Sequence, residues 1–116
     1  MVAVITALFA GFTGCDKDNQ IRRADLLGDW KVVKYNDEPI NVPHTQTYKA
    51  DGTFEELMII NDVPVPYTGT WKLDEDERQV VLVKQNQSQI LDIVSLSGSK
   101  FVYTDYIGDK FELERP

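Results

Sequence analysis

The chain has 116 residues with 19 acidic and 12 basic side chains, so its formal net charge is −7 at pH 7. This length fits one domain and allows a single hydrophobic core. The acidic balance disfavours nucleic-acid binding, which needs a basic surface, and also electrostatic binding to anionic lipid headgroups. The single cysteine excludes an internal disulfide, and the single histidine excludes metal sites that need a histidine pair. We therefore expect neither a metal nor a cofactor.

Residues 1–14 form an apolar run without charge or proline. The run is shorter than the roughly 20 apolar residues of a membrane-spanning helix, but it matches the apolar core of an export signal that ends in small residues. Such a signal opens with basic residues, and residues 1–14 have none. We therefore expect codons for Lys or Arg just upstream of Met1.

The only cysteine ends the string Phe12-Thr13-Gly14-Cys15, which resembles the bacterial lipobox. In that motif small residues precede a cysteine that is diacylated and becomes the mature N-terminus. The resemblance implies a signal peptide over residues 1–14, a lipid on Cys15 and a polar tether over residues 15–20. It places the protein in the bacterial cell envelope, anchored to the outer membrane and facing the periplasm or the cell surface. A buried structural thiol is the alternative, whereas a catalytic cysteine would need a partner base.

After the tether, Ile21–Leu27 is expected to form one or two helical turns that end at Gly28. The rest of the chain alternates short β-rich runs with turn residues, which is typical of a barrel or a sandwich. The connections are too short for crossover helices, so neighbouring strands should pair antiparallel. Eight strands are predicted: Asp29–Tyr35, Thr45–Lys49, Thr53–Ile60, Val65–Leu73, Gln79–Lys84, Gln89–Leu96, Lys100–Tyr106 and Lys110–Arg115.

The pattern within the runs indicates which faces are buried. Alternation is clearest in the fourth run, where one face carries Val65, Tyr67, Gly69, Trp71 and Leu73. The adjacent Val32 and Val33 break the alternation in the first run, which indicates a β-bulge or burial on both faces. The third, fifth and sixth runs are apolar on both faces, so we expect their outer faces to be partly covered or to be buried against another molecule. Closure of eight strands into an up-and-down barrel removes exposed edges, and a flattened sandwich is the alternative.

In such a barrel, the connections after the odd-numbered strands share one end. At the other end the connections, such as Asp51-Gly52, are tight and polar. Segments 36–44 and 61–64 are longer and carry apolar residues, so we expect an open mouth covered by a lid. Apolar walls with a few hydroxyls would hold one small, mostly apolar ligand there. The candidate ligand-binding residues are Tyr35, Ile40, Val42, His44, Val65, Tyr67 and Tyr106.

Three strings in order resemble the lipocalin-like domains of small bacterial lipoproteins, which belong with the calycins. They are Leu26-Leu27-Gly28-Asp29-Trp30, Tyr48-Lys49-Ala50-Asp51-Gly52-Thr53-Phe54 and Gly69-Thr70-Trp71-Lys72-Leu73. The resemblance covers most of the chain and implies an all-β domain over residues 21–116. Its fold would be an eight-stranded antiparallel up-and-down lipocalin-like β-barrel with a short N-terminal helix. It also implies that Arg115 lies across the indole of Trp30 at the closed end, a cation–π contact of about 0.5–2 kcal/mol.

Two functions are compatible with these patterns. The first is a membrane-anchored lipocalin-like lipoprotein that binds a small, mostly apolar ligand in the barrel mouth. The alternative is a packed barrel that acts in protein–protein interaction, as an envelope inhibitor or accessory subunit, and whose acidic surface contacts a basic partner. An enzyme is disfavoured, because the serines lack a nucleophile-elbow context and the acidic run 74–77 lacks calcium-loop spacing. The patterns do not indicate an oligomeric state.

Overall fold

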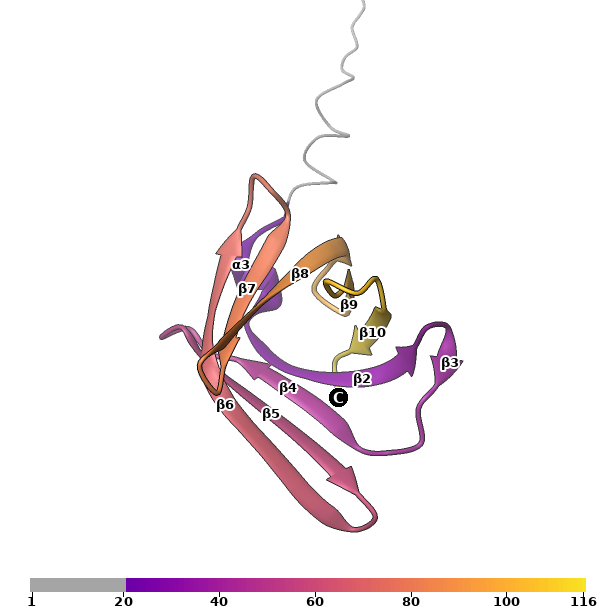
Figure 1. The fold of residues 1–116 in the computed structure, drawn as a ribbon. Coiled ribbons are helices and arrows are strands. Elements are labelled where there is room, and N and C mark those ends of the chain that lie inside the picture. The colour runs from indigo at the N-terminus through magenta and orange to yellow at the C-terminus, as the bar shows by residue number, and fades with distance from the viewer. Residues whose placement is uncertain (1–20) are drawn as a thin grey trace, which may run out of the picture.

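A short helix and one antiparallel sheet make up residues 21–116, the part of the chain that this computed structural model describes (Figure 1). The helix α3 spans Arg23–Leu26. The strands are β2 (Gly28–Tyr35), β3 (Glu38–Pro39), β4 (His44–Tyr48), β5 (Thr53–Ile60), β6 (Val63–Asp74), β7 (Gln79–Lys84), β8 (Gln87–Leu96), β9 (Lys100–Thr104) and β10 (Lys110–Glu114). The long strands pair antiparallel in chain order, and β10 pairs with β2, so the sheet closes on itself. The predicted eight-stranded up-and-down barrel is confirmed, and β3 is a two-residue addition beside β2.

The predicted elements agree closely with the observed ones. All eight predicted runs are strands, and each boundary lies within two residues of its prediction. The helix lies inside the predicted Ile21–Leu27. The predicted signal peptide, the lipid attachment at Cys15 and the tether lie outside the described residues and stay predictions. No helix within residues 21–116 is long and apolar enough to cross a membrane.

The adjacent valines of β2 form a β-bulge. Val32 pairs with Leu113 and Lys34 pairs with Glu112, so Val33 is an extra residue on the β2 side of the β2–β10 ladder. Of the two explanations that the sequence allowed, the structure therefore shows the bulge. Because a bulge increases the local twist of its strand, it helps the sheet to curve at the point where the barrel closes.

The prediction of a long apolar connection over residues 61–64 is wrong. Val63 and Pro64 belong to β6 and pair with the end of β5, which leaves Asn61 and Asp62 as a two-residue turn. Both turn residues have positive φ, 51° and 65°, as a type I′ hairpin turn requires. The connection between β7 and β8 is an equally short turn with positive φ at both residues. Tight turns therefore border this end of the barrel.

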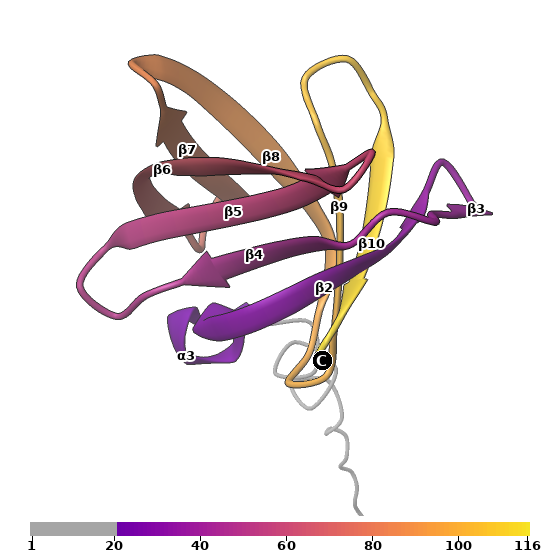
Figure 2. The same ribbon diagram turned by 90° about the horizontal axis from the view of Figure 1, so that it is seen from below.

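The segment between β2 and β4 does not form the predicted lid either. It turns at Asn36 and Asp37, and β3 then pairs back onto β2. The backbone N–H of Ile40 donates to the carbonyl of Val33 at 3.2 Å. These bonds hold the segment against the edge of β2 that also pairs with β4, and Figure 2 shows β3 projecting from the side of the barrel.

The hydrophobic core fills one end of the barrel. At this end α3 lies beside the start of β2 (Figure 2). Trp30 is fully buried, and its indole N–H donates to the carbonyl of Leu26 in α3 at 2.8 Å. Tyr48 lies edge-on to Phe54 and Trp71, at ring-centroid distances of 5.0 and 5.5 Å. The other fully or almost fully buried apolar side chains are Leu26, Val32, Val80, Leu82, Leu91, Phe101 and Leu113. This end is therefore closed by packed side chains.

Arg115 lies on the outside of the closed end and contacts several of its elements. Its guanidinium lies 3.8 Å from the centroid of the Trp30 ring. It donates to the backbone carbonyls of Asp25 in α3, Asp29 in β2 and Gly98 in the turn before β9. One side chain thus joins the helix, the first strand and a distant hairpin, in the place where the family resemblance implied a contact with Trp30.

Gly69 marks the point along β6 where the core gives way to a more open interior. A Cβ at this position would lie 1.9 Å from the carbonyl oxygen of Val83 on β7. Because any side chain would collide there, the close approach of β6 and β7 requires glycine. Trp71 lies on the core side of Gly69 along β6, and Tyr67 lies on the other side.

Candidate functional site

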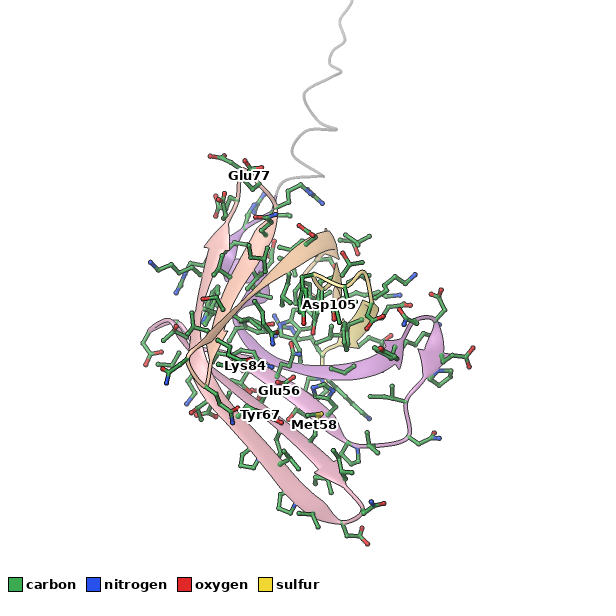
Figure 3. All side chains as sticks on the ribbon, in the orientation of Figure 1. Glu56, Met58, Tyr67, Glu77, Lys84 and Asp105 are labelled. Carbon is green, nitrogen blue, oxygen red and sulfur yellow. The ribbon has the colours of Figure 1, made fainter. Side chains whose placement is uncertain are left out.

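A pocket of about 410 Å³ lies inside the barrel, at the end opposite α3. Figure 3 shows Glu56, Lys84 and Tyr67 close together there, and Glu77 far away at the opposite end. Seven strands contribute to the walls because inward-facing positions recur at every second residue. The lining residues are His44, Gln46, Glu56, Met58, Tyr67, Leu82, Lys84, Gln85, Gln87, Gln89, Leu91, Tyr103, Asp105 and Phe111.

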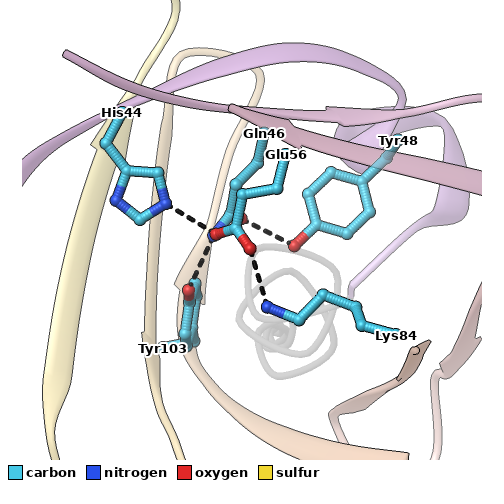
Figure 4. A network of polar contacts seen from close by, with 6 residues as sticks. All are labelled: His44, Gln46, Tyr48, Glu56, Lys84 and Tyr103. Atoms are coloured by element: carbon cyan, nitrogen blue, oxygen red, sulfur yellow. Dashed lines mark hydrogen bonds and ion pairs between the residues drawn. The ribbon is translucent and has the colours of Figure 1, made fainter. Parts of the chain in front are cut away.

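A buried carboxylate, Glu56, forms the centre of the pocket floor (Figure 4). Its side chain is 5% exposed. His44 Nε2 lies 2.6 Å from Glu56 Oε2, and Lys84 Nζ lies 2.6 Å from Glu56 Oε1. Gln46 donates a third hydrogen bond to Oε2 at 3.1 Å. The carboxylate therefore has partners on both oxygens, supplied by β4 and β7.

The hydrogen bonds continue from Gln46 to two tyrosines. The Gln46 amide nitrogen donates to the Tyr103 hydroxyl at 3.0 Å, and the amide oxygen accepts from the Tyr48 hydroxyl at 2.9 Å. Within residues 21–116, no buried side-chain nitrogen or oxygen lacks a partner. The network is therefore complete without a ligand, and it forms a rigid polar layer between the apolar core and the mouth.

The surroundings of Glu56 keep it ionised. Burial alone would raise the pKa of this carboxyl, but hydrogen bonds and charge from His44 and Lys84 outweigh burial and lower the pKa to about 2. Burial raises the pKa of the Tyr103 and Tyr48 hydroxyls, so both stay protonated and can donate. At neutral pH, Glu56 thus accepts hydrogen bonds and cannot release a proton.

Three glutamine amides border the mouth above this layer. Gln87 and Gln89 occupy alternate, inward-facing positions on β8, and Gln85 belongs to the turn before it. Their side-chain amides make no hydrogen bond to any other residue of the described part of the chain. Gln89 is half-buried, and the other two are exposed. These amides can therefore bind a molecule in the pocket without breaking protein contacts.

Of the seven predicted ligand-binding residues, the structure brings two, His44 and Tyr67, into the pocket lining. Tyr35 lies at the rim, edge-on to Phe111, and its hydroxyl donates to Asp109 at 2.7 Å. Val65 is half-buried one inward position beyond Tyr67 on β6, and it is not a lining residue.

The other three predicted residues do not line this pocket, and one of them, Ile40, packs against the hydrophobic core. Ile40 and Val42 line a shallow groove along β2, because the pairing of β3 with β2 holds this segment away from the mouth. Tyr106 is 76% exposed and lines a second shallow groove together with Gln87, Ser88, Gln89 and Ile90 of β8.

The sequence interpretation missed the residues that give the pocket its chemistry, above all Glu56, Lys84 and Gln46. One signal could have pointed to Glu56. It stands between Phe54 and Met58 at alternate positions of β5, so it faces inward with them. A charged residue on an inward face needs a partner inside the barrel.

Comparisons with known proteins agree on the architecture. A family model described as a C-terminal lipocalin-like domain matches residues 10–105. The crystal structure of a lipocalin-like protein from Bacteroides uniformis superposes with a TM-score of 0.68 at 15% identity, covering 79% of this chain and 99% of that one. An NMR structure of another protein from the same organism gives a TM-score of 0.64 at 21% identity, covering 86% and 96%. No curated protein matches the sequence. At these identities the two structures support the fold alone.

Proposed function

Because the chain belongs to the family of C-terminal lipocalin-like domains, we propose that it is a lipid-anchored binding domain that holds one small molecule in the pocket at the open end of its barrel. The observation that carries this proposal is the layering inside the barrel. A complete hydrogen-bond network forms the floor, and three amides without protein partners among the described residues stand above it. The volume of about 410 Å³ falls in the range of ligand pockets, about 300–1,000 Å³.

The pocket lining is mostly polar, so the ligand that we propose differs from the mostly apolar ligand that the sequence predicted. Ten of the fourteen lining residues carry a polar side-chain atom, the exceptions being Met58, Leu82, Leu91 and Phe111. The sequence predicted apolar walls, and a mostly apolar ligand would leave many of these polar groups dehydrated without partners. A ligand with several hydrogen-bonding groups fits the pocket better.

We propose binding without catalysis. The name of the family model, GH43_C, comes from a glycosidase family, and glycoside hydrolysis needs a carboxylic acid that can donate a proton near neutral pH. The buried carboxyl of this pocket, Glu56, has a pKa of about 2 and is already paired with His44 and Lys84. Within residues 21–116, no group of three His, Cys, Asp or Glu side chains is placed to hold a metal ion.

A binding test uses a substitution that fills the pocket. Wild type and Gln87→Trp are compared in thermal-shift and calorimetric titrations with neutral, anionic, cationic and apolar small molecules. We expect at least one class to bind wild type with a stoichiometry near one and to lose affinity at least tenfold for Gln87→Trp. The matched control is Gln79→Trp, because Gln79 lies on β7 and bonds Asp92 on the outer face. Equal binding by all three proteins would contradict a site in the pocket.

The lipid anchor is proposed from the lipobox at Cys15 and is tested separately. The intact mass of the protein from the membrane of its native host should match Cys15–Pro116 plus acyl chains, and Cys15→Ser should remove the acyl mass. A mass of unprocessed Met1–Pro116 would contradict the anchor and the envelope location together. It would leave the binding proposal untouched, because the pocket contains no residue before His44.

A protein partner is the second candidate function, and one observation favours it. Apolar side chains are exposed on β8, with Ile90 at 44% and Val94 at 54%, and in the loop after β9, with Tyr106 at 76% and Ile107 at 68%. The net charge of −7 suits a basic partner. In that case Ile90→Ser/Val94→Ser would abolish co-purification with such a partner and leave small-molecule binding unchanged.

A further inference from the structure

We infer that the pocket takes a neutral, hydroxyl-rich molecule of the carbohydrate class, oriented by the side-chain amides of Gln85, Gln87 and Gln89. This inference rests on the proposed function, since it names the ligand class of the same pocket. Three features of the described residues carry it: the pairing of amides with hydroxyls, the charge balance of the lining, and the apolar surfaces between the polar groups.

The amides match hydroxyl groups in their hydrogen-bonding capacity. Each glutamine side chain offers two donor hydrogens and an acceptor oxygen, and each sugar hydroxyl both donates and accepts. Gln87 and Gln89 project from the same face of β8, about 7 Å apart along the strand, so they can bind hydroxyls at two positions of one molecule. A ligand without such groups would dehydrate these amides without replacing their bonds to water.

The charges of the lining favour a neutral ligand. Glu56 and Asp105 carry −1 each and Lys84 carries +1, so these three side chains sum to −1, and any charge on His44 would lie against Glu56. The Lys84 ammonium and the His44 ring both contact Glu56 at 2.6 Å, so the basic side chains of the lining already have a carboxylate partner and are not free for an anionic ligand. The Asp105 carboxylate accepts the backbone N–H groups of Ile107 and Asp109 at 3.0 Å each, which reduces its attraction for a cationic one.

Apolar surfaces complete the match, because a sugar ring has polar edges and apolar faces. Tyr67, Met58 and Phe111 lie in the same lining as the amides. The ammonium nitrogen of Lys84 lies 5.2 Å from the centroid of the Tyr67 ring. These side chains can pack against ring C–H groups while the amides hold the hydroxyls.

The test titrates the purified full chain with three kinds of probe and follows its side-chain amide resonances by NMR. The neutral probes are xylose, arabinose, galactose and N-acetylglucosamine, the anionic probe is glucuronate, and the apolar probe is N-phenylnaphthylamine. We expect a neutral saccharide to shift the amides of Gln85, Gln87 and Gln89 with saturation near one to one. Glucuronate should bind at least tenfold more weakly, and the apolar probe should leave the three amides unshifted.

Near-isosteric variants assign the contacts. Gln87→Met and Gln89→Met remove the amide and keep the side-chain length, so each should weaken saccharide binding about two- to tenfold. Gln79→Met is the matched control, because it removes a glutamine amide from the outer face of the barrel, and it should leave the affinity unchanged.

Each of the other outcomes would contradict a specific part of the proposal. If the apolar probe binds in the pocket and no saccharide does, the ligand class is wrong and the proposed function stands. If a saccharide binds but Gln87→Met and Gln89→Met behave like Gln79→Met, the assignment to these amides is wrong. If no probe of any kind binds, both the ligand class and the proposed function fail.

Discussion

The two ends of the barrel are built by the same strands with opposite chemistry. On β8, the inward-facing residue is Leu91 toward the closed end and Gln87 at the mouth. On β4, it changes from Tyr48 to His44 over four residues. The closed half excludes water and is sealed by packing, whereas the open half keeps ionised and amide groups in the same interior. The packing that stabilises the fold and the polar groups of the proposed binding site are therefore separated along the strands rather than between strands.

The largest expected difference between the two halves lies in the response to losing a side chain. Trp30→Ala removes a fully buried indole that packs 5.7 Å from Phe101 between ring centroids, and it should lower the free energy of unfolding by about 3–5 kcal/mol. Met58→Ala in the half-buried pocket lining should cost only about 1 kcal/mol. Urea denaturation followed by circular dichroism measures both. The loss of stability for Trp30→Phe should fall between those of the two alanine variants. Equal losses for Trp30→Ala and Met58→Ala would contradict the difference between the closed and open halves.

Acid should destabilise the fold through protonation of Glu56 in the open half. Its pKa is about 2 in the folded protein against an ordinary 4.5, so the unfolded chain takes up the proton first as the pH falls. The stabilisation is fully present above pH 4.5, and it is lost between about pH 4.5 and 2. The difference in pKa corresponds to about 3 kcal/mol.

The measurement is the urea midpoint from pH 7 to 2, compared between wild type and Glu56→Gln. The variant should lack this part of the pH dependence and keep the part that comes from exposed carboxyls, such as Asp109, whose pKa is lowered by hydrogen bonds from Tyr35 and Asn36. Parallel curves would show that Glu56 does not titrate as proposed.

Removing one partner of the buried ion pair should cost less than acid does. Lys84→Met leaves the Glu56 carboxylate with His44 and Gln46, and the loss of stability should be about 2 kcal/mol. The double variant Lys84→Met/Glu56→Gln has no unpaired charge, so its loss should be smaller than the sum of the two single losses. Additive losses in urea denaturation would mean that the two groups do not interact.

The strands could be predicted because alternation and turn residues are local properties. The valine pair of β2 even indicated its bulge. The error at residues 61–64 has a local cause too. The sequence pattern places Val63 and Pro64 in the connection, yet Pro64 pairs with Ile59 near the start of β6, where a missing N–H is tolerated.

The pocket chemistry could not be predicted, because it depends on which inward-facing residues meet across the barrel. Glu56 and Lys84 are 28 positions apart on strands that are not neighbours, with β6 between them. Closure and curvature of the sheet bring the two side chains together. The sequence alone shows that Glu56 and Lys84 can face inward, but not that one carboxylate accepts bonds from both His44 and Lys84.

The smallest expected effect concerns the outside of the closed end. Arg115→Met keeps an aliphatic side chain over Trp30 but removes the cation–π contact and the bonds to the carbonyls of Asp25, Asp29 and Gly98. We expect a loss of about 1–2 kcal/mol in urea denaturation. Because these bonds lie at the far end of the barrel from Gln87, small-molecule binding should be unchanged.

Two further variants distinguish the hydrogen bonds of the Arg115 guanidinium from its positive charge. Arg115→Lys keeps the charge but cannot donate to three carbonyls at once, so its stability should lie between wild type and Arg115→Met. Lys100→Met removes a cation that is 52% exposed and lies 3.7 Å from the Glu112 carboxylate, and it should cost less than about 1 kcal/mol. If Arg115→Met cost no more than Lys100→Met, the closed end would be held by its apolar packing alone, and the contrast between the two ends would lie entirely inside the barrel.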